Sequence, residues 1–251
     1  HMEIIQERLQ REFGINIIST SPSVSYHVHK TDGTTITVDN PTLFPQVTEI
    51  ASIDEPFILA FIVAPTDAIG TIMGMVQDRR GFSTHTESLP LIQRVLMTFE
   101  LPLNEVIVDF HDKLKSATRG YASMDYEIID YSPYDIIKLD ILINMDPVDA
   151  FSTLIHSEKA ATRGRQLAEK LKEVIPKHMF QVIIQAAIGG KIVARETIRA
   201  MKKDVTAKCY GGDISRKRKL WEKQKEGKKR MKQVGKVNIP QKAFLDVLRA
   251  E

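Results

Sequence analysis

The order in which strand-like and helix-like hydrophobic patterns follow one another in the middle of the chain constrains the fold more than any other feature. Between Glu55 and Tyr131 we predict a strand, a helix, two strands, a helix and a strand, over residues 57–64, 66–80, 82–88, 91–99, 103–117 and 121–131. This order is that of a split-βαβ, or ferredoxin-like, domain, in which two helices cover one face of a four-stranded sheet. The strongest apolar run, Phe57–Pro65, is strand-sized and falls short of the about 20 residues that span a bilayer.

The segment before the ferredoxin-like domain predicts one helix and one strand, which are too few elements to form a domain. Residues 2–13 have apolar side chains at helical spacing and are followed by Gly14, a helix stop signal. Residues 15–28 read as an extended strand, in which Pro22 indicates either an edge position or a bulge, and Asp32-Gly33 then predicts a hairpin turn. We expect the helix and strand to pack loosely on the ferredoxin-like domain or to pair with another copy of the chain.

The pattern changes again after Pro133, so the fold class is α+β with more than one domain. We predict a strand (136–144), a charged helix interrupted near Gly164 (150–175), two β-rich runs about Gly189-Gly190 (181–198), a short basic helix near Ala200 and a closing amphipathic helix (240–248). The domain bounds that follow are 1–30 (helix and strand), 31–54 (hairpin and linker), 55–132 (ferredoxin-like) and 133–251 (a second α+β domain).

Positive charge is concentrated in one segment near the end of the chain. Between residues 216 and 236 the only acids are Glu222 and Glu226, against eleven cations: Arg216, Lys217, Arg218, Lys219, Lys223, Lys225, Lys228, Lys229, Arg230, Lys232 and Lys236. The segment therefore carries +9; because the whole chain carries +3, the remainder carries −6. Such asymmetry indicates a polyanionic partner.

Three uses of this basic segment compete. A solvated helix face normally interleaves acids with its cations, and two glutamates do not balance eleven cations. Binding to a membrane surface needs a broad apolar face, whereas the helical projection has one mixed stripe: Leu220, Gln224, Gly227, Met231 and Val234. Binding to a phosphate backbone needs only many cations, with aromatic residues available for stacking. We therefore favour nucleic acid and keep anionic lipid as the alternative.

The sequence contains no catalytic or metal-binding constellation that stands out. None of its Gly-Lys pairs fits the phosphate-binding loop of nucleotide hydrolases. His27 and His29 share one face of a strand and lack a third ligand, so a metal site there is the minor alternative. Cys209 is the single cysteine, which excludes an internal disulfide framework. A cleft that joined it to His178 and Glu173 would be needed to revive an enzymatic function.

Over essentially its whole length the sequence resembles the C-terminal half of LepA, the family of translational GTPases also called elongation factor 4. The stretches that carry the resemblance are HMEIIQERLQREF, TRGYASMDYE, IIKLDILIN, IQAAIGGKIVARET and AKCYGGDISRKRKLWEKQKEGKKRMKQ. The middle region, with EPFILAFIVAPTDAIGTIMGMVQDRRG and LPLNEVIVDFHDKLKSATRGYASMDYE, is similar to domain V of elongation factor G as well.

The resemblance implies that residues 2–28 end domain III, that 55–131 form domain V, and that the rest is a domain specific to LepA. It implies that GTP and magnesium belong to a G domain absent here, so this chain has no cofactor and is inactive alone. Its partners would be the ribosome, large-subunit rRNA and tRNA, in a process proposed to be back-translocation that affects the fidelity of protein synthesis. The expected location is the cytoplasm, with the inner membrane surface or an organellar matrix as alternatives, and the expected state is a monomer.

Several residues outside the charge count are candidate contacts to RNA. Cations near the ends of the two domain V helices could meet rRNA phosphates or could simply complement the helix dipoles: Arg79, Arg80, Lys113, Lys115 and Arg119. Gly81, next to the two arginines, would permit a tight turn there. Tyr210 and Trp221 could stack on bases, although packing is the more common use of lone aromatic residues. Gly211-Gly212 reads as a flexible entry to the basic helix, with Asp213 as its N-cap.

Overall fold

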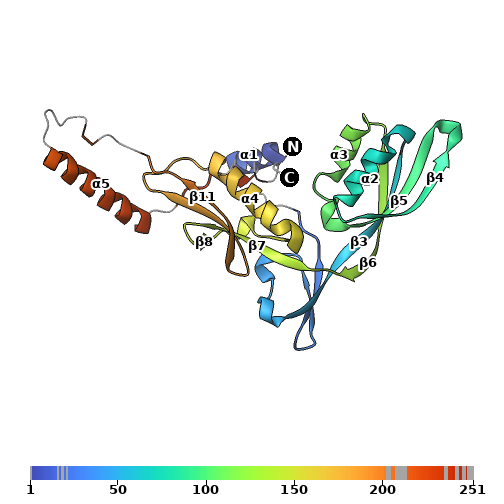
Figure 1. Cartoon of the computed structure of the whole chain (residues 1–251), viewed down its shortest axis with the longest axis horizontal. Coiled ribbons are helices and arrows are strands. Elements are labelled where there is room, and N and C mark those ends of the chain that lie inside the picture. Colours follow the sequence, from blue (N-terminus) through green and yellow to red (C-terminus); the bar gives the residue numbers. More distant parts are fainter. Residues whose placement is uncertain are drawn as a thin grey trace. The chain divides into compact units, whose positions relative to one another are not determined.

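The computed structural model describes residues 2–15, 17, 20, 22–201, 205–206, 214–234, 237–240, 243–244 and 247 (Figure 1). The chain forms two compact units. We call Ser21–Lys138 with Thr153–Ser157 the central unit. The C-terminal unit comprises His1–Thr20, Leu139–Ser152 and Glu158–Ala250.

The central unit is built on a six-stranded antiparallel sheet. Its strands are β1 (Tyr26–Lys30), β2 (Thr35–Val38), β3 (Ile50–Pro65), β4 (Phe82–Leu89), β5 (Arg94–Pro102) and β6 (Ser123–Pro133). The strand order is β2-β1-β3-β5-β4, and β6 pairs with the other side of β3. The subset β6-β3-β5-β4, with helices α2 (Ile69–Gln77) and α3 (Phe110–Ala117) on one face, confirms the predicted ferredoxin-like arrangement.

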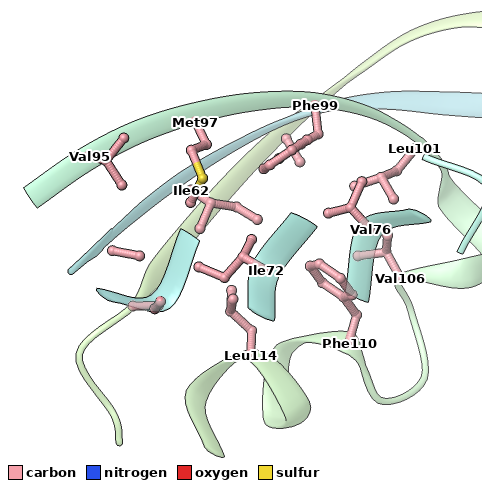
Figure 2. Close-up of a cluster of buried hydrophobic side chains, with 14 of the residues drawn as sticks. Ile62, Ile72, Val76, Val95, Met97, Phe99, Leu101, Val106, Phe110 and Leu114 are labelled. Atoms are coloured by element: carbon pink, nitrogen blue, oxygen red, sulfur yellow. The ribbon is translucent and has the colours of Figure 1, made fainter. Parts of the chain in front are cut away.

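The core of this domain follows from the two-residue repeat of β3 and β5. Alternate residues of these central strands point toward the helices and are fully buried or nearly so: Ile58, Ala60, Ile62, Ala64, Val95, Met97, Phe99 and Leu101. Ile72 and Val76 of α2 and Phe110 and Leu114 of α3 fill the space between sheet and helices (Figure 2). Full burial of each large aliphatic or aromatic side chain stabilises the fold by roughly 1.5–3 kcal/mol.

A second, smaller core lies under the β1–β2 hairpin. It comprises Val24, Tyr26, Val28, Val38, Ile53, Ile136 and Leu154. The N-terminal part of β3 pairs with β1 in this region, while its C-terminal part pairs with β5 and β6. One 16-residue strand therefore joins the hairpin to the ferredoxin-like domain.

The C-terminal unit combines a smaller sheet with helices. Its elements are α1 (Met2–Phe13), most of β7 (Ile136–Ile143), β8 (Asp146–Pro147), α4 (Ser157–Val174), β10 (Val182–Ile188), β11 (Lys191–Ile198) and α5 (Ile214–Val234). The strand β9 (Thr153–His156) belongs to the central unit. The sheet order is β11-β10-β7-β8. Gly164 of α4 packs so closely on this sheet that a Cβ there would lie 2.9 Å from the Cβ of Ala186. The predicted interruption near Gly164 is thus wrong: the helix is continuous, and the glycine permits its close packing.

The structure corrects several predicted element bounds. Helical segments start later than predicted because short 3-10 turns precede them: η3 (Thr66–Ala68) before α2, and η5 (Leu103–Glu105) well before α3. The predicted helix 150–175 begins only at Ser157, after the strand β9. Residues 199–201 are not helical.

The leading helix is confirmed at Met2–Phe13, but the predicted strand bounds and the predicted packing of both elements are wrong. The strand is Tyr26–Lys30, the described residues between 15 and 25 are not in a strand, and β1 pairs with β2 and β3 of its own chain. The helix α1 belongs to the C-terminal unit and not to the ferredoxin-like domain. The hairpin turn at Asp32-Gly33 and the turn at Gly189-Gly190 are confirmed.

Candidate nucleic-acid interface

Helix α5 carries ten of the eleven predicted RNA-binding cations. Its 21 residues are mostly Lys, Arg, Glu, Gln and other good helix formers without proline, which explains why so charged a segment is helical. The cations are distributed along the whole helix, from Arg216 to Lys232. Lys236 lies outside the described residues, as do Tyr210, Gly211, Gly212 and Asp213.

Few of these cations are neutralised within the described chain. Arg218 pairs with Glu222 at 3.6 Å and Arg230 with Glu226 at 2.6 Å, and all four side chains are at least 62% exposed. Such exposed pairs contribute little to stability. Among the described residues, no carboxylate partner is found for Lys217, Lys219, Lys223, Lys225, Lys229 and Lys232. The helix therefore keeps a dense field of available positive charge.

One side of α5 is less exposed than the rest, and it is not apolar. Its half-buried residues are Lys217, Leu220, Gln224, Gly227 and Lys228, while Trp221 and Met231 are 56% and 48% exposed. Insertion into a membrane surface would need a continuous apolar face, which this mixture does not supply. No helix of the described residues is long and apolar enough to span a membrane.

A groove of about 820 Å³ separates α5 from the neighbouring end of the β10–β11 hairpin. The hairpin side contributes Gln181, Thr197, Arg199 and Ala200, and the helix side contributes Glu222, Lys225, Glu226, Lys228, Lys229 and Lys232. The Nζ atom of Lys228 donates a hydrogen bond to the carbonyl oxygen of Met201 at 2.9 Å, which ties the helix to the segment after β11. Five cations, two carboxylates and two neutral polar side chains thus line one concave surface, and positive charge predominates there. Such a surface suits a phosphodiester segment.

Sequence reasoning missed the contribution of Arg199 to this groove. Arg199 is separated from the basic segment by more than fifteen residues and lies in a stretch for which the sequence predicts a short helix. Only the fold brings it opposite the lysines of α5. The sequence shows that Arg199 is a cation, but its spacing from the basic segment does not predict that it lines the same groove.

The two arginines after α2 form ion pairs with carboxylates of their own domain. Arg79 donates from Nε to the carbonyl oxygen of Glu105 at 3.0 Å and from Nη2 to Asp109 at 2.5 Å. Arg80 donates from both Nη atoms to the carboxylate of Glu55, at 2.9 and 3.0 Å, and from Nε to Glu105. Their side chains are only 12% and 13% exposed. These contacts favour a structural role over contact with rRNA.

The Arg80 cluster is buried in the central unit. Glu55 has no exposed surface, and the Arg80 guanidinium also lies over the ring of Tyr134. Burial raises the pKa of Glu55 although the hydrogen bonds from Arg80 act to lower it. Burial would lower the pKa of Arg80, but the carboxylates of Glu55 and Glu105 raise it. Arg80 is therefore held as a cation inside the domain.

Gly81 has a different role from the predicted tight turn. Arg80 itself takes the left-handed conformation that reverses the chain, with φ of 61°. A Cβ at Gly81 would lie 2.4 Å from a methyl carbon of Leu101, so the glycine is needed for close packing.

The cations near the end of α3 are more available. Lys113 is 53% exposed and forms an ion pair with Asp109. Lys115 and Arg119 are exposed, and no ion pair is found for either among the described residues. Arg119 has φ of 54°, which places it in the turn that ends the helix. These two cations remain candidates for contact with rRNA.

The histidines considered for a metal site or a catalytic cleft contact protein groups of ordinary kinds. The ring of His27 stacks on Tyr131, and His29 contacts Asp54 and Thr35 at 2.8 Å each. His178 donates from Nδ1 to the carbonyl oxygen of Pro176 and accepts at Nε2 from the backbone of Asn238. Glu173 pairs with Lys170, and Cys209 lies outside the described residues. The described residues contain no group of three or more metal-binding side chains.

Two known protein families match the chain. One match covers the ferredoxin-like domain, and the other covers the region that contains the basic helix. Residues 143–249 match the C-terminus of the GTP-binding protein LepA, and residues 52–142 match the C-terminus of elongation factor G. The chain therefore carries a domain of the LepA C-terminus type after a domain of the elongation factor G C-terminus type. The resemblance noted in the sequence is thereby confirmed.

Curated relatives of the LepA family align along the whole chain. Elongation factor 4 of Protochlamydia amoebophila is 59% identical over 250 residues, and those of Clostridium botulinum and Ruminiclostridium cellulolyticum are 57% identical over 251 residues. The alignments cover all of this chain and 41–42% of the relatives, so the chain spans about two-fifths of their length. A crystal structure of a protein from Thermus thermophilus matches 33% of this chain, and 12% of its own, at 24% identity with a TM-score of 0.31.

Proposed function

We propose that this chain is the ribosome-binding part of a LepA-type translation factor and that α5 grips RNA phosphates. The observation that carries the proposal is the set of lysines on α5 that have no carboxylate partner in the described chain, beside a groove lined by further cations. Phosphate contacts need cations whose charge is not already used, and each contact displaces counterions from the RNA. The chain works by positioning and not by chemistry.

At the level of the whole factor, we propose an action on ribosome–tRNA complexes that depends on GTP bound by another domain. The relatives are named elongation factor 4, and the matched family is named a GTP-binding protein. The partners that this role requires are large-subunit rRNA and tRNA, and back-translocation is the process we propose. Lys115 and Arg119 are the central-unit cations that fit a contact with rRNA, because both are exposed.

The proposal is tested by the salt dependence of binding to purified ribosomes. If α5 contacts about six phosphates, the logarithm of the binding constant falls with the logarithm of salt concentration at a slope of roughly −4 to −5. The triple variant Arg216→Ala, Lys217→Ala, Arg218→Ala should make that slope shallower by about one unit per lost contact and weaken binding at low salt.

A matched control separates loss of contact from loss of net charge. Lys159, Lys170 and Lys172 of α4 are three cations on another helix of the C-terminal unit, and the corresponding triple alanine variant removes the same charge. We expect this control to bind with nearly unchanged slope. Equal affinities of the α5 variant and the unmodified chain would exclude α5 as the contact. Stronger retention of the chain on anionic vesicles than on ribosomes would also overturn the proposal.

A further inference from the structure

The sheet of the central unit has a second face that points away from α2 and α3 (Figure 1). The pairing register shows which residues share it: Leu59 lies beside Glu100 and Glu127, and Phe61 beside Thr98 and Asp125. Val63 lies beside Leu96, which in turn neighbours Glu87. We call this surface the open face. No helix of the described part of the central unit packs on it.

The centre of the open face is an apolar stripe. It consists of Leu59, Phe61, Val63 and Leu96, which are half-buried by their neighbours and do not belong to the core beneath the helices. Large apolar side chains on the uncovered side of a sheet cost hydration free energy unless a partner covers them.

The β4–β5 hairpin extends this apolar surface at its tip. The turn η4 (Pro90–Ile92) displays Leu91 at 99% exposure and Ile92 at 59%. The chain reverses at Gln93, whose φ of 52° is left-handed. Neither aliphatic side chain at the tip contributes to the described core. Fully exposed aliphatic residues at a hairpin tip can serve as anchors for a pocket on another protein.

The border of the open face is negatively charged. Glu87, Glu100, Asp125 and Glu127 flank the apolar stripe, and the described residues offer none of them an ion pair. Among the described residues of this face, Arg94 at the base of the hairpin tip is the permanently charged cation, and His85 lies opposite Thr98. A surface of this sign repels phosphates, so this face is unsuited to RNA, in contrast to α5.

We propose that the open face and the β4–β5 tip dock a basic protein, whose lysines or arginines meet the four carboxylates around an apolar contact. The two parts of the surface have separate tasks. The stripe and Leu91 supply the buried apolar contact, and the carboxylates select a partner of opposite charge and speed its association. The same charges disfavour an RNA or an acidic protein as the occupant.

The test uses the RNA-free protein fraction of large ribosomal subunits as a defined set of basic proteins. The choice of this probe rests on the proposed function, but the fraction lacks RNA, so its result is independent of the α5 experiment. The immobilised chain should retain one protein, which is then identified, purified and titrated against variants. Leu91→Asp and the double variant Glu87→Lys, Glu127→Lys should each weaken its binding by roughly tenfold or more.

Two control variants match these changes elsewhere in the same unit. Leu43 is 65% exposed in the turn η1 (Pro41–Leu43), so Leu43→Asp places the same charge on another exposed leucine. Asp112 lies on α3, on the opposite side of the sheet, so Asp112→Lys reverses a charge away from the open face. Both controls should bind as the unmodified chain does, and circular dichroism of all variants should be the same.

Four outcomes would overturn the proposal. These are retention of no protein, retention of an acidic protein only, equal binding by the test and control variants, or dimerisation of the chain through Leu91 in analytical ultracentrifugation. Retention of added ribosomal RNA that is abolished by Leu91→Asp would show that the face binds nucleic acid instead.

Discussion

The end of α2 and the helix α5 both present clustered cations in the sequence, but the structure uses them in opposite ways. Arg79 and Arg80 are nearly buried and meet three carboxylates that lie 25 to 30 residues away. On α5, Arg218 and Arg230 instead meet Glu222 and Glu226, exposed glutamates one turn away on the same helix, and six lysines have no carboxylate partner in the described chain. The number of cations in a segment therefore says less about nucleic-acid binding than whether the fold supplies carboxylates to meet them.

The largest effect should come from breaking the buried pair. Arg80→Ala leaves the Glu55 carboxylate without its bidentate partner in a site that has no exposed surface. Removing one partner of a buried pair costs roughly 3–5 kcal/mol of unfolding free energy. Urea denaturation measures the change. Lys115→Ala, an exposed cation of the same unit, should change the stability by less than about 0.5 kcal/mol. An Arg80→Ala variant as stable as the unmodified chain would exclude a structural role for Arg80.

The groove lysines should have the next largest effect, on binding instead of stability. Because each lost phosphate contact weakens salt-dependent binding, the triple variant Lys225→Ala, Lys229→Ala, Lys232→Ala should lose roughly a hundredfold in ribosome affinity at low salt, with an unchanged urea midpoint. Arg199→Ala should lose about tenfold, because it lines the same groove. Lys191→Ala, a cation at the turn between β10 and β11 that does not line the groove, is the control. Equal losses for Lys191→Ala and Arg199→Ala would show that the groove is not the contact.

The exposed cations of the central unit test whether RNA contacts extend beyond α5. Lys115→Ala with Arg119→Ala should weaken ribosome binding by up to about tenfold and leave the fold intact, because neither residue has an ion-pair partner in the described chain. The measurement is co-sedimentation with ribosomes at two salt concentrations. Thermal denaturation of the same variant checks that its stability is retained. Unchanged affinity would restrict the RNA contact to the C-terminal unit.

The smallest effect concerns Asp109 and its dependence on pH. Burial acts to raise its pKa, but hydrogen bonds from Lys113 and Arg79 lower it overall. A carboxyl group whose pKa is lowered by folding stabilises the fold above its unfolded pKa, about 3.9, and loses that contribution as pH falls below this value. Asp109→Asn should thus reduce stability by about 1–2 kcal/mol at pH 7 and by much less near pH 2. Urea denaturation at both pH values measures the difference. An equal loss at both would assign the effect to packing instead of charge.

Features that depend on neighbouring residues could be predicted from the sequence. The alternation of patterns between residues 55 and 131 determines the ferredoxin-like order, since periodicity reports which side of each element is buried. Turns at Asp32-Gly33 and Gly189-Gly190 follow from glycine's access to positive φ, which both Gly33 and Gly190 adopt. The composition of α5 likewise determines both its helicity and its charge.

Only the tertiary structure decided which charges are free and which surfaces are shared. Whether Arg80 could reach a phosphate depended on Glu55, which lies on a different element and belongs to no local pattern. The same holds for Arg199 opposite α5, for Gly164 against Ala186, and for the carboxylates of β4, β5 and β6 that strand pairing brings onto one face. Each of these results from contacts between residues far apart in the chain, and periodicity or composition carries no record of such contacts.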